Sequence, residues 1–130
     1  MTLPAPAPLE RRVLEAVDVD GLLACVDELV AIPSTAGDES PAQEAVAARM
    51  ERLGLEVDAW SLDLDALRRH PAYTADVERD GGLGVVGTLG AGAARTLILN
   101  AHVDVVSAGE PARWTHPPWR ATVAGGRLVG

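Results

Sequence analysis

The sequence has 130 residues, with 11 basic and 19 acidic side chains and a formal net charge of −8. This balance argues against a nucleic-acid-binding protein, which needs a basic surface, and against a polybasic membrane anchor. Hydrophobic residues make up 48% of the chain, so the composition indicates a folded domain whose length allows a self-standing core. Because the chain has no Phe and few other aromatic residues, we expect that core to consist of Ala, Val and Leu.

A single cysteine, Cys25, excludes an internal disulfide and favours a reducing compartment, the cytoplasm. Because no histidine is near it in the sequence, we expect Cys25 to be a small buried hydrophobic residue rather than a nucleophile. Residues 1–12 lack the apolar segment of a secretory signal. The longest charge-free run, residues 81–94, is too short and too rich in glycine to cross a bilayer, so no membrane partner is expected.

The first elements in chain order are an extended tail and two helices. Residues 1–8 alternate proline with small residues and predict a loose tail. Apolar side chains at helical spacing over residues 9–17 predict a short helix. A second helix is expected to begin with Asp20 as its N-cap and to end before Pro33, because the residue before a proline avoids the helical region.

A third helix is predicted from Ser40 to about residue 53. Ser40 and Gln43 have the spacing of a capping box, in which each side chain binds a backbone N–H at the helix start. Pro41 suits the first helical position. Gly54 follows the last apolar residue of the helical pattern, in the place where glycine commonly ends a helix.

Strands are predicted in the second half of the chain. Alternating side chains predict a strand over residues 55–60, followed by a short helix over 63–70 and a second strand over 83–89. The glycines of that second strand have the spacing of a dinucleotide-binding loop, but they open no helix and are interpreted as strand and turn residues. The strongest strand prediction is 96–106, whose first half is continuously apolar, as in a strand covered on both faces.

The last predicted element is a hairpin, in which Ala124-Gly125-Gly126 forms the turn between two short strands. Helices followed by strands in this order predict the α/β class, with helices packed on a mixed sheet.

Two polar residues that could bind a metal or take part in catalysis, His102 and Asp104, follow the apolar run. Residues two apart in a strand lie on the same face, about 7 Å apart, so these side chains are expected to be neighbours. An imidazole that ligates a metal needs an acceptor on its other nitrogen, and a carboxylate supplies one. The alternative interpretation is a histidine that is merely hydrogen-bonded to a nearby aspartate at a strand end.

A longer pattern surrounds this pair, TLILNAHVDVVSAGEPARWTHPPWRATVAGGRLVG, and is preceded by LLACVDELVAIPSTAGDESPAQEAVAARMERLGLEV. Over about residues 20–130 the sequence resembles the zinc metallopeptidase and deacylase family. That family includes acetylornithine deacetylase, succinyl-diaminopimelate desuccinylase, aminoacylase and the glutamate carboxypeptidases. The family pattern is an apolar strand, Gly-His-x-Asp-Val-Val-Pro, a loop with Gly and Trp, and a turn, so several spaced elements match in order.

The resemblance implies roles for individual residues. His102 matches the first zinc-ligating histidine, and Asp104 matches the acid that orients this histidine and assists catalysis. Ser34 matches the serine of an Ile-Pro-Ser segment and is expected to be structural. His116 stands where the family often has Asp and is a candidate substrate-binding residue on the rim of the site. His70 is interpreted as a helix-end residue.

The resemblance also implies a domain organisation. Residues 1–19 are expected to be a proline-rich tail and a short helix, and 20–130 the N-terminal part of the catalytic domain. The remaining metal ligands, the other half of that domain and the dimerisation lid match no part of the chain. We therefore expect the chain alone to bind zinc weakly and to be inactive, and a homodimer only for a full-length version.

The function implied by the resemblance is zinc-dependent hydrolysis of an amide in an N-acyl amino acid or small peptide. The complete family enzyme holds two zinc ions, with cobalt or manganese as alternatives. The other interpretation is a non-catalytic fragment, or a binding domain that uses an open sheet edge.

Overall fold

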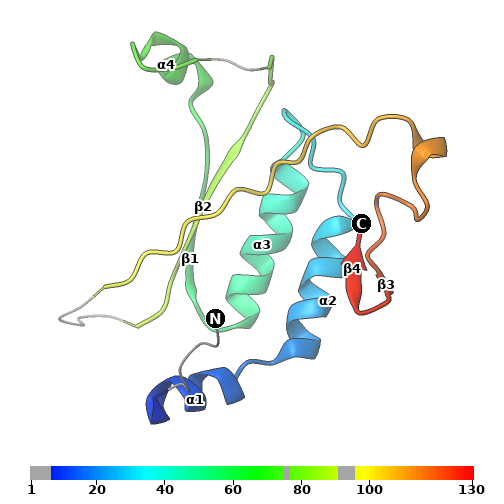
Figure 1. Cartoon of the computed structure of the whole chain (residues 1–130). Coiled ribbons are helices and arrows are strands. Elements are labelled where there is room, and N and C mark those ends of the chain that lie inside the picture. Colours follow the sequence, from blue (N-terminus) through cyan, green and yellow to red (C-terminus); the bar gives the residue numbers. More distant parts are fainter. Residues whose placement is uncertain (1–6, 75–76, 91–95) are drawn as a thin grey trace.

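The computed structural model describes residues 7–74, 77–90 and 96–130 (Figure 1). In chain order its elements are α1 (Pro8–Glu15), α2 (Val19–Val30), α3 (Ser40–Arg52), β1 (Glu56–Ser61), α4 (Leu64–Arg69), β2 (Leu83–Thr88), a 3-10 turn η1 (Pro111–Arg113), β3 (Thr122–Ala124) and β4 (Arg127–Val129). Helices with small antiparallel sheets fit the predicted α/β class.

Helices α1 and α2 occupy the predicted parts of the chain, but the predicted cap of α2 was wrong. Asp18 is the N-cap, and its carboxylate accepts a hydrogen bond from the Gly21 N–H at 2.9 Å. Asp18 has the extended backbone that a capping residue needs, whereas Asp20 already lies in the first turn. There its negative charge is favourable beside the positive end of the helix dipole.

Helix α3 begins at Ser40 with a proline in its first turn, as predicted, but without the capping box. Glu39 occupies the N-cap position in helical conformation, and no side chain caps the helix start. The side chain of Gln43 instead accepts a hydrogen bond from the Leu83 N–H at 3.3 Å. Gln43 therefore connects α3 to the first residue of β2.

Strands β1 and β2 pair antiparallel along their full lengths, from Glu56 opposite Thr88 to Ser61 opposite Leu83. Two glycines of β2 allow close packing on this sheet. A Cβ at Gly84 would overlap the Trp60 ring, and one at Gly87 would lie 2.7 Å from Sδ of Met50, on α3. The glycines are strand residues that admit neighbouring side chains, which agrees with the interpretation that they form no dinucleotide loop.

The predicted strand over residues 96–106 was wrong. Residues 96–104 have no strand pairing and run as an extended trace (Figure 1). Leu97, Ile98 and Leu99 are 81%, 83% and 87% exposed. Within the described residues, the predicted strand pairs with another segment at one place, a parallel bridge between Val105 and Thr35. An apolar run becomes a covered strand only when neighbouring strands lie along its edges, and the described residues place none there.

The C-terminal hairpin agrees with the prediction. Strands β3 and β4 pair antiparallel, with Ala124 opposite Arg127. Gly125 and Gly126 have φ angles of 58° and 73°, which is the turn geometry that suits the twist of a two-residue hairpin. The position of a Cβ on Gly130 would lie 2.7 Å from the Val30 side chain, so the chain end lies beside the end of α2.

The expected self-standing core was wrong for the part of the chain that the structure describes, where Ala42 is the one buried hydrophobic residue. The accessible surface is 10657 Å², whereas a compact monomer of this mass exposes about 6500 Å². The expected mixed sheet is replaced, among the described residues, by two separate two-stranded sheets. Two small sheets have too little area to cover the apolar helix faces, so Leu22 and Leu23 of α2 are exposed.

Candidate functional site

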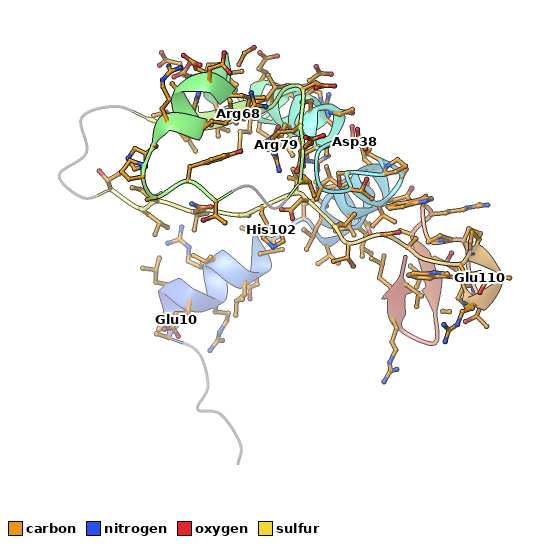
Figure 2. The ribbon with its side chains drawn as sticks, turned by 90° about the horizontal axis from the view of Figure 1, so that it is seen from above. Glu10, Asp38, Arg68, Arg79, His102 and Glu110 are labelled. Carbon is orange, nitrogen blue, oxygen red and sulfur yellow. The ribbon has the colours of Figure 1, made fainter. Side chains whose placement is uncertain are left out.

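The structure brings the two predicted site residues, His102 and Asp104, into direct contact. Nδ1 of His102 lies 2.9 Å from Oδ1 of Asp104 and 3.2 Å from the Asp104 carbonyl oxygen. The His102 side chain is 84% exposed and that of Asp104 is 50% exposed. Figure 2 labels His102 on the extended segment, away from the hairpin β3–β4.

The contact arises by a different route from the predicted one. The prediction placed both side chains on one face of a strand, whereas residues 101–104 are in no strand. The contact is instead local, because the two residues are only two positions apart in a non-strand segment. If Nδ1 carries the proton that is donated to Asp104, the lone pair of the neutral ring is on Nε2, which is the tautomer of a metal-ligating histidine.

A residue far away in the sequence holds the backbone on both sides of Asp104. The Ser34 hydroxyl donates to the Val103 carbonyl at 2.7 Å, and the Val105 N–H donates to the Ser34 carbonyl at 3.0 Å. Ser34 is 3% exposed. The sequence resemblance indicated a structural serine in the Ile-Pro-Ser segment, but a contact across 69 residues has no local sequence signal.

The residues present fit one zinc ligand and not a complete zinc site. His102 supplies an imidazole, and Asp104 is the carboxylate acceptor that such a ligand needs. A catalytic zinc site takes about three protein ligands. Residues 7–74, 77–90 and 96–130 contain no cluster of three His, Cys, Asp or Glu side chains that could hold a metal ion.

The other histidines lie apart from this pair. His116 is half-buried in the loop between η1 and β3, and none of the hydrogen bonds found among the described residues joins it to His102 or Asp104. His70 follows α4, where its Nδ1 accepts a hydrogen bond from the Ala72 N–H at 3.2 Å. Cys25 is half-buried on α2 rather than fully buried as predicted.

Sequence reasoning missed a partly buried ion pair, between Arg79 and Glu39. The closest guanidinium–carboxylate distance is 3.3 Å, and the side chains are 26% and 10% exposed. Glu39 also accepts a hydrogen bond from the Gly37 N–H at 2.9 Å. The pair joins two loops that line a polar pocket of about 320 Å³, formed by residues 36–38, 40 and 78–81. His102 does not line this pocket, and the 40-residue separation of the charges hides the pair from sequence patterns.

No helix in the described ranges is long and apolar enough to cross a membrane.

Comparisons with known proteins identify relatives, although no family model matches the chain. The chain is 35% identical over 112 residues to an N-formyl-4-amino-5-aminomethyl-2-methylpyrimidine deformylase of Halalkalibacterium halodurans, covering 84% of this chain and 23% of that protein. It is 28% identical over 108 residues to a succinyl-diaminopimelate desuccinylase of Paracidovorax citrulli, and 32% identical over 108 residues to that of Leptothrix cholodnii. Both matches cover 83% of this chain and 25% of the relative. The chain thus spans about a quarter of the length of these relatives.

Proposed function

Because the chain belongs to the peptidase and deacylase family of succinyl-diaminopimelate desuccinylase, we propose that it forms the N-terminal part of a zinc-dependent amidohydrolase. The proposed substrates are N-acyl amino acids or small peptides. Its relatives are named as enzymes that remove a formyl or a succinyl group, so an N-acyl bond is the shared chemistry.

One observation carries the proposal, the contact of 2.9 Å between His102 Nδ1 and Asp104 Oδ1. In the proposed site His102 is a zinc ligand through Nε2, and Asp104 fixes the tautomer and the orientation of the imidazole. Zinc, when bound, supplies Lewis-acid chemistry by polarising a carbonyl and lowering the pKa of a water molecule. Asp104 is proposed as the catalytic carboxylate of this part, because the family resemblance matches it to the acid that assists catalysis and its side chain is half-exposed.

Further ligands for two zinc ions, or for cobalt or manganese in their place, must come from polypeptide beyond the His102–Asp104 pair. Within the described residues no third ligand approaches the pair. The proposed partner of the site is therefore a small-molecule substrate bound jointly by this part and the remaining catalytic part, with His116 as a rim residue. A homodimer is proposed only for the full-length version, and nucleic acid and membrane are not proposed as partners.

A second candidate function is favoured by the exposed run from Leu97 to Leu99, each more than four-fifths exposed. As a non-catalytic fragment, the chain would bind another polypeptide through the open edges of this extended segment. In the first candidate function the segment is covered by the remaining part of the catalytic domain, and an amide is hydrolysed. In the second it is covered by another polypeptide, and no hydrolysis follows.

The test is a chimera in which this chain is joined to the remaining part of the Paracidovorax citrulli relative. We expect the chimera to hydrolyse an N-succinyl or N-formyl amide, to lose activity on chelation and to regain it with zinc, with the intact relative as the control. Released amine measures the rate. A folded chimera that binds zinc but hydrolyses neither amide would contradict the proposal and favour the binding function.

A further inference from the structure

We propose that Ser34 is a positioning residue for the His102–Asp104 pair, acting by fixing the backbone of Asp104. The inference rests on the proposed function, because that function makes His102 a zinc ligand. It assigns a specific task to a buried hydroxyl that does not touch the pair's side chains.

Ser34 contacts the two peptide groups that flank Asp104. Its hydroxyl donates to the Val103 carbonyl at 2.7 Å, and its carbonyl accepts from the Val105 N–H at 3.0 Å. The first peptide group sets the φ rotation of Asp104 and the second sets its ψ rotation. One residue therefore restrains both backbone torsions of the carboxylate that holds His102.

The burial of Ser34 makes this restraint firm. Ser34 is 3% exposed, and its own N–H donates to the Ile32 carbonyl at 2.8 Å. All three of its polar groups are therefore hydrogen-bonded away from competing water. Figure 2 shows the extended segment around His102 running beside the loop after α2, to which Ser34 belongs.

The rest of the segment lacks comparable support. Within the described residues, the long-range hydrogen bonds found for 96–106 are the two that join it to Ser34, one donated by the Ser34 hydroxyl and one by the Val105 N–H. The side chains of the preceding apolar run are exposed, so packing does not hold the pair. Loss of the hydroxyl should release the φ rotation of Asp104 while leaving the backbone bond between Val105 and Ser34 intact.

The experiment is a zinc chloride titration of the full 130-residue chain at fixed pH, followed through the ring-proton NMR signals of its three histidines. Because the described residues offer the pair no third ligand, we expect weak zinc binding, with His102 preferred over His70 and His116 since Asp104 orients its ring. In Ser34→Ala the zinc affinity at His102 should fall about tenfold, the lower range for loss of an outer-shell contact. The affinities of His70 and His116 should stay unchanged, and these residues report any general loss of structure.

Two further variants keep the test decisive. Ser34→Thr retains the hydroxyl and should keep the wild-type zinc affinity at His102, and Ser40→Ala, a matched serine change at the start of α3, should keep it as well. Unchanged affinity in Ser34→Ala, or equal losses in Ser34→Ala and Ser34→Thr, would overturn the positioning role. Absence of any zinc preference for His102 in the wild-type chain would instead contradict the proposed role of His102 as a zinc ligand.

Discussion

Strand β2 and the extended segment 96–104 both have apolar sequences but lie in different environments. Leu83 and Val85 of β2 are half-buried against neighbours, whereas Leu97 and Ile98 are more than 80% exposed. The partners of β2 are β1 and α3, which come before it in the chain with α4 as the one named element in between. The segment 96–104 is held at Val103 by Ser34, and the next residue, Val105, forms a bridge with Thr35, both far away in sequence. Elements with partners close in sequence are therefore complete here, and the site segment depends on distant contacts.

The largest expected effect is in the packed region, at Gly87. In Gly87→Val the new side chain would meet Met50 and Leu55, whose atoms lie 2.7 and 2.8 Å from the Cβ position. We expect the free energy of unfolding to fall by about 2–3 kcal/mol, as for other overpacked sites. The matched change Gly81→Val, where no atom lies within 4 Å of the Cβ position, should cost far less. Amide hydrogen exchange in β1 and β2 measures both, and equal effects would contradict the packing described for β2.

The ion pair between Arg79 and Glu39 should have the next largest effect. Arg79→Met leaves a carboxylate that is 10% exposed without its cation, and we expect a loss of about 1–2 kcal/mol in stability. The control is Arg52→Met, which breaks the exposed pair with Glu28 and should cost about 0.5 kcal/mol or less. Urea unfolding curves compare the variants. A larger loss in the control would show that burial does not distinguish the two pairs.

The cap of α2 offers a smaller effect. Asp18→Ala removes the carboxylate that binds the Gly21 N–H and should lower stability by about 1 kcal/mol. Asp20→Ala removes only a favourable charge in the first helical turn, so the expected loss is about 0.3 kcal/mol. Far-UV circular dichroism during urea unfolding measures the difference. Reversal of this order would restore Asp20 as the capping residue.

The smallest effect on stability is expected in the extended segment. Ile98 is 83% exposed, so Ile98→Thr should change the free energy of unfolding by less than about 0.5 kcal/mol. The same change should reduce self-association, because an exposed apolar run with unpaired edges promotes it. Sedimentation velocity measures association. A wild-type chain that remains a monomer at high concentration would contradict the prediction that this segment promotes self-association.

The sequence predicted the elements whose determinants are local. The helices, the individual strands β1 and β2 and the Gly125–Gly126 hairpin follow from periodicity and turn chemistry over short spans, whereas the pairing of β1 with β2 was not predicted. The prediction for 96–106 failed because an apolar pattern specifies a preference for burial and does not supply the neighbouring strands. The N-cap predictions for α2 and α3 failed for a related reason, since neighbouring polar residues compete and tertiary contacts such as Gln43 to Leu83 decide between them, whereas Gly54 follows the C-cap of α3 with a positive φ, as predicted.

The candidate site was predicted in part. The spacing of His102 and Asp104 predicted their proximity, and the structure has the two side chains in contact. Their roles as zinc ligand and catalytic carboxylate remain predictions. The hydrogen bonds of Ser34 to the backbone on both sides of Asp104 could not be predicted. They depend on how the loop after α2 packs against a segment 69 residues away.

The most direct measurement of the central claim is the zinc content of the chimera with the Paracidovorax citrulli relative, carrying His102→Ala or Asp104→Asn. His102→Ala should lose nearly all zinc from the site and nearly all amide hydrolysis, because it removes a direct ligand. Asp104→Asn should weaken zinc affinity or activity about 10–100-fold, because it removes the charge that orients the imidazole, and the control His70→Ala should match the parent. Normal zinc content and a normal rate in His102→Ala would contradict the assignment of His102 as a metal ligand.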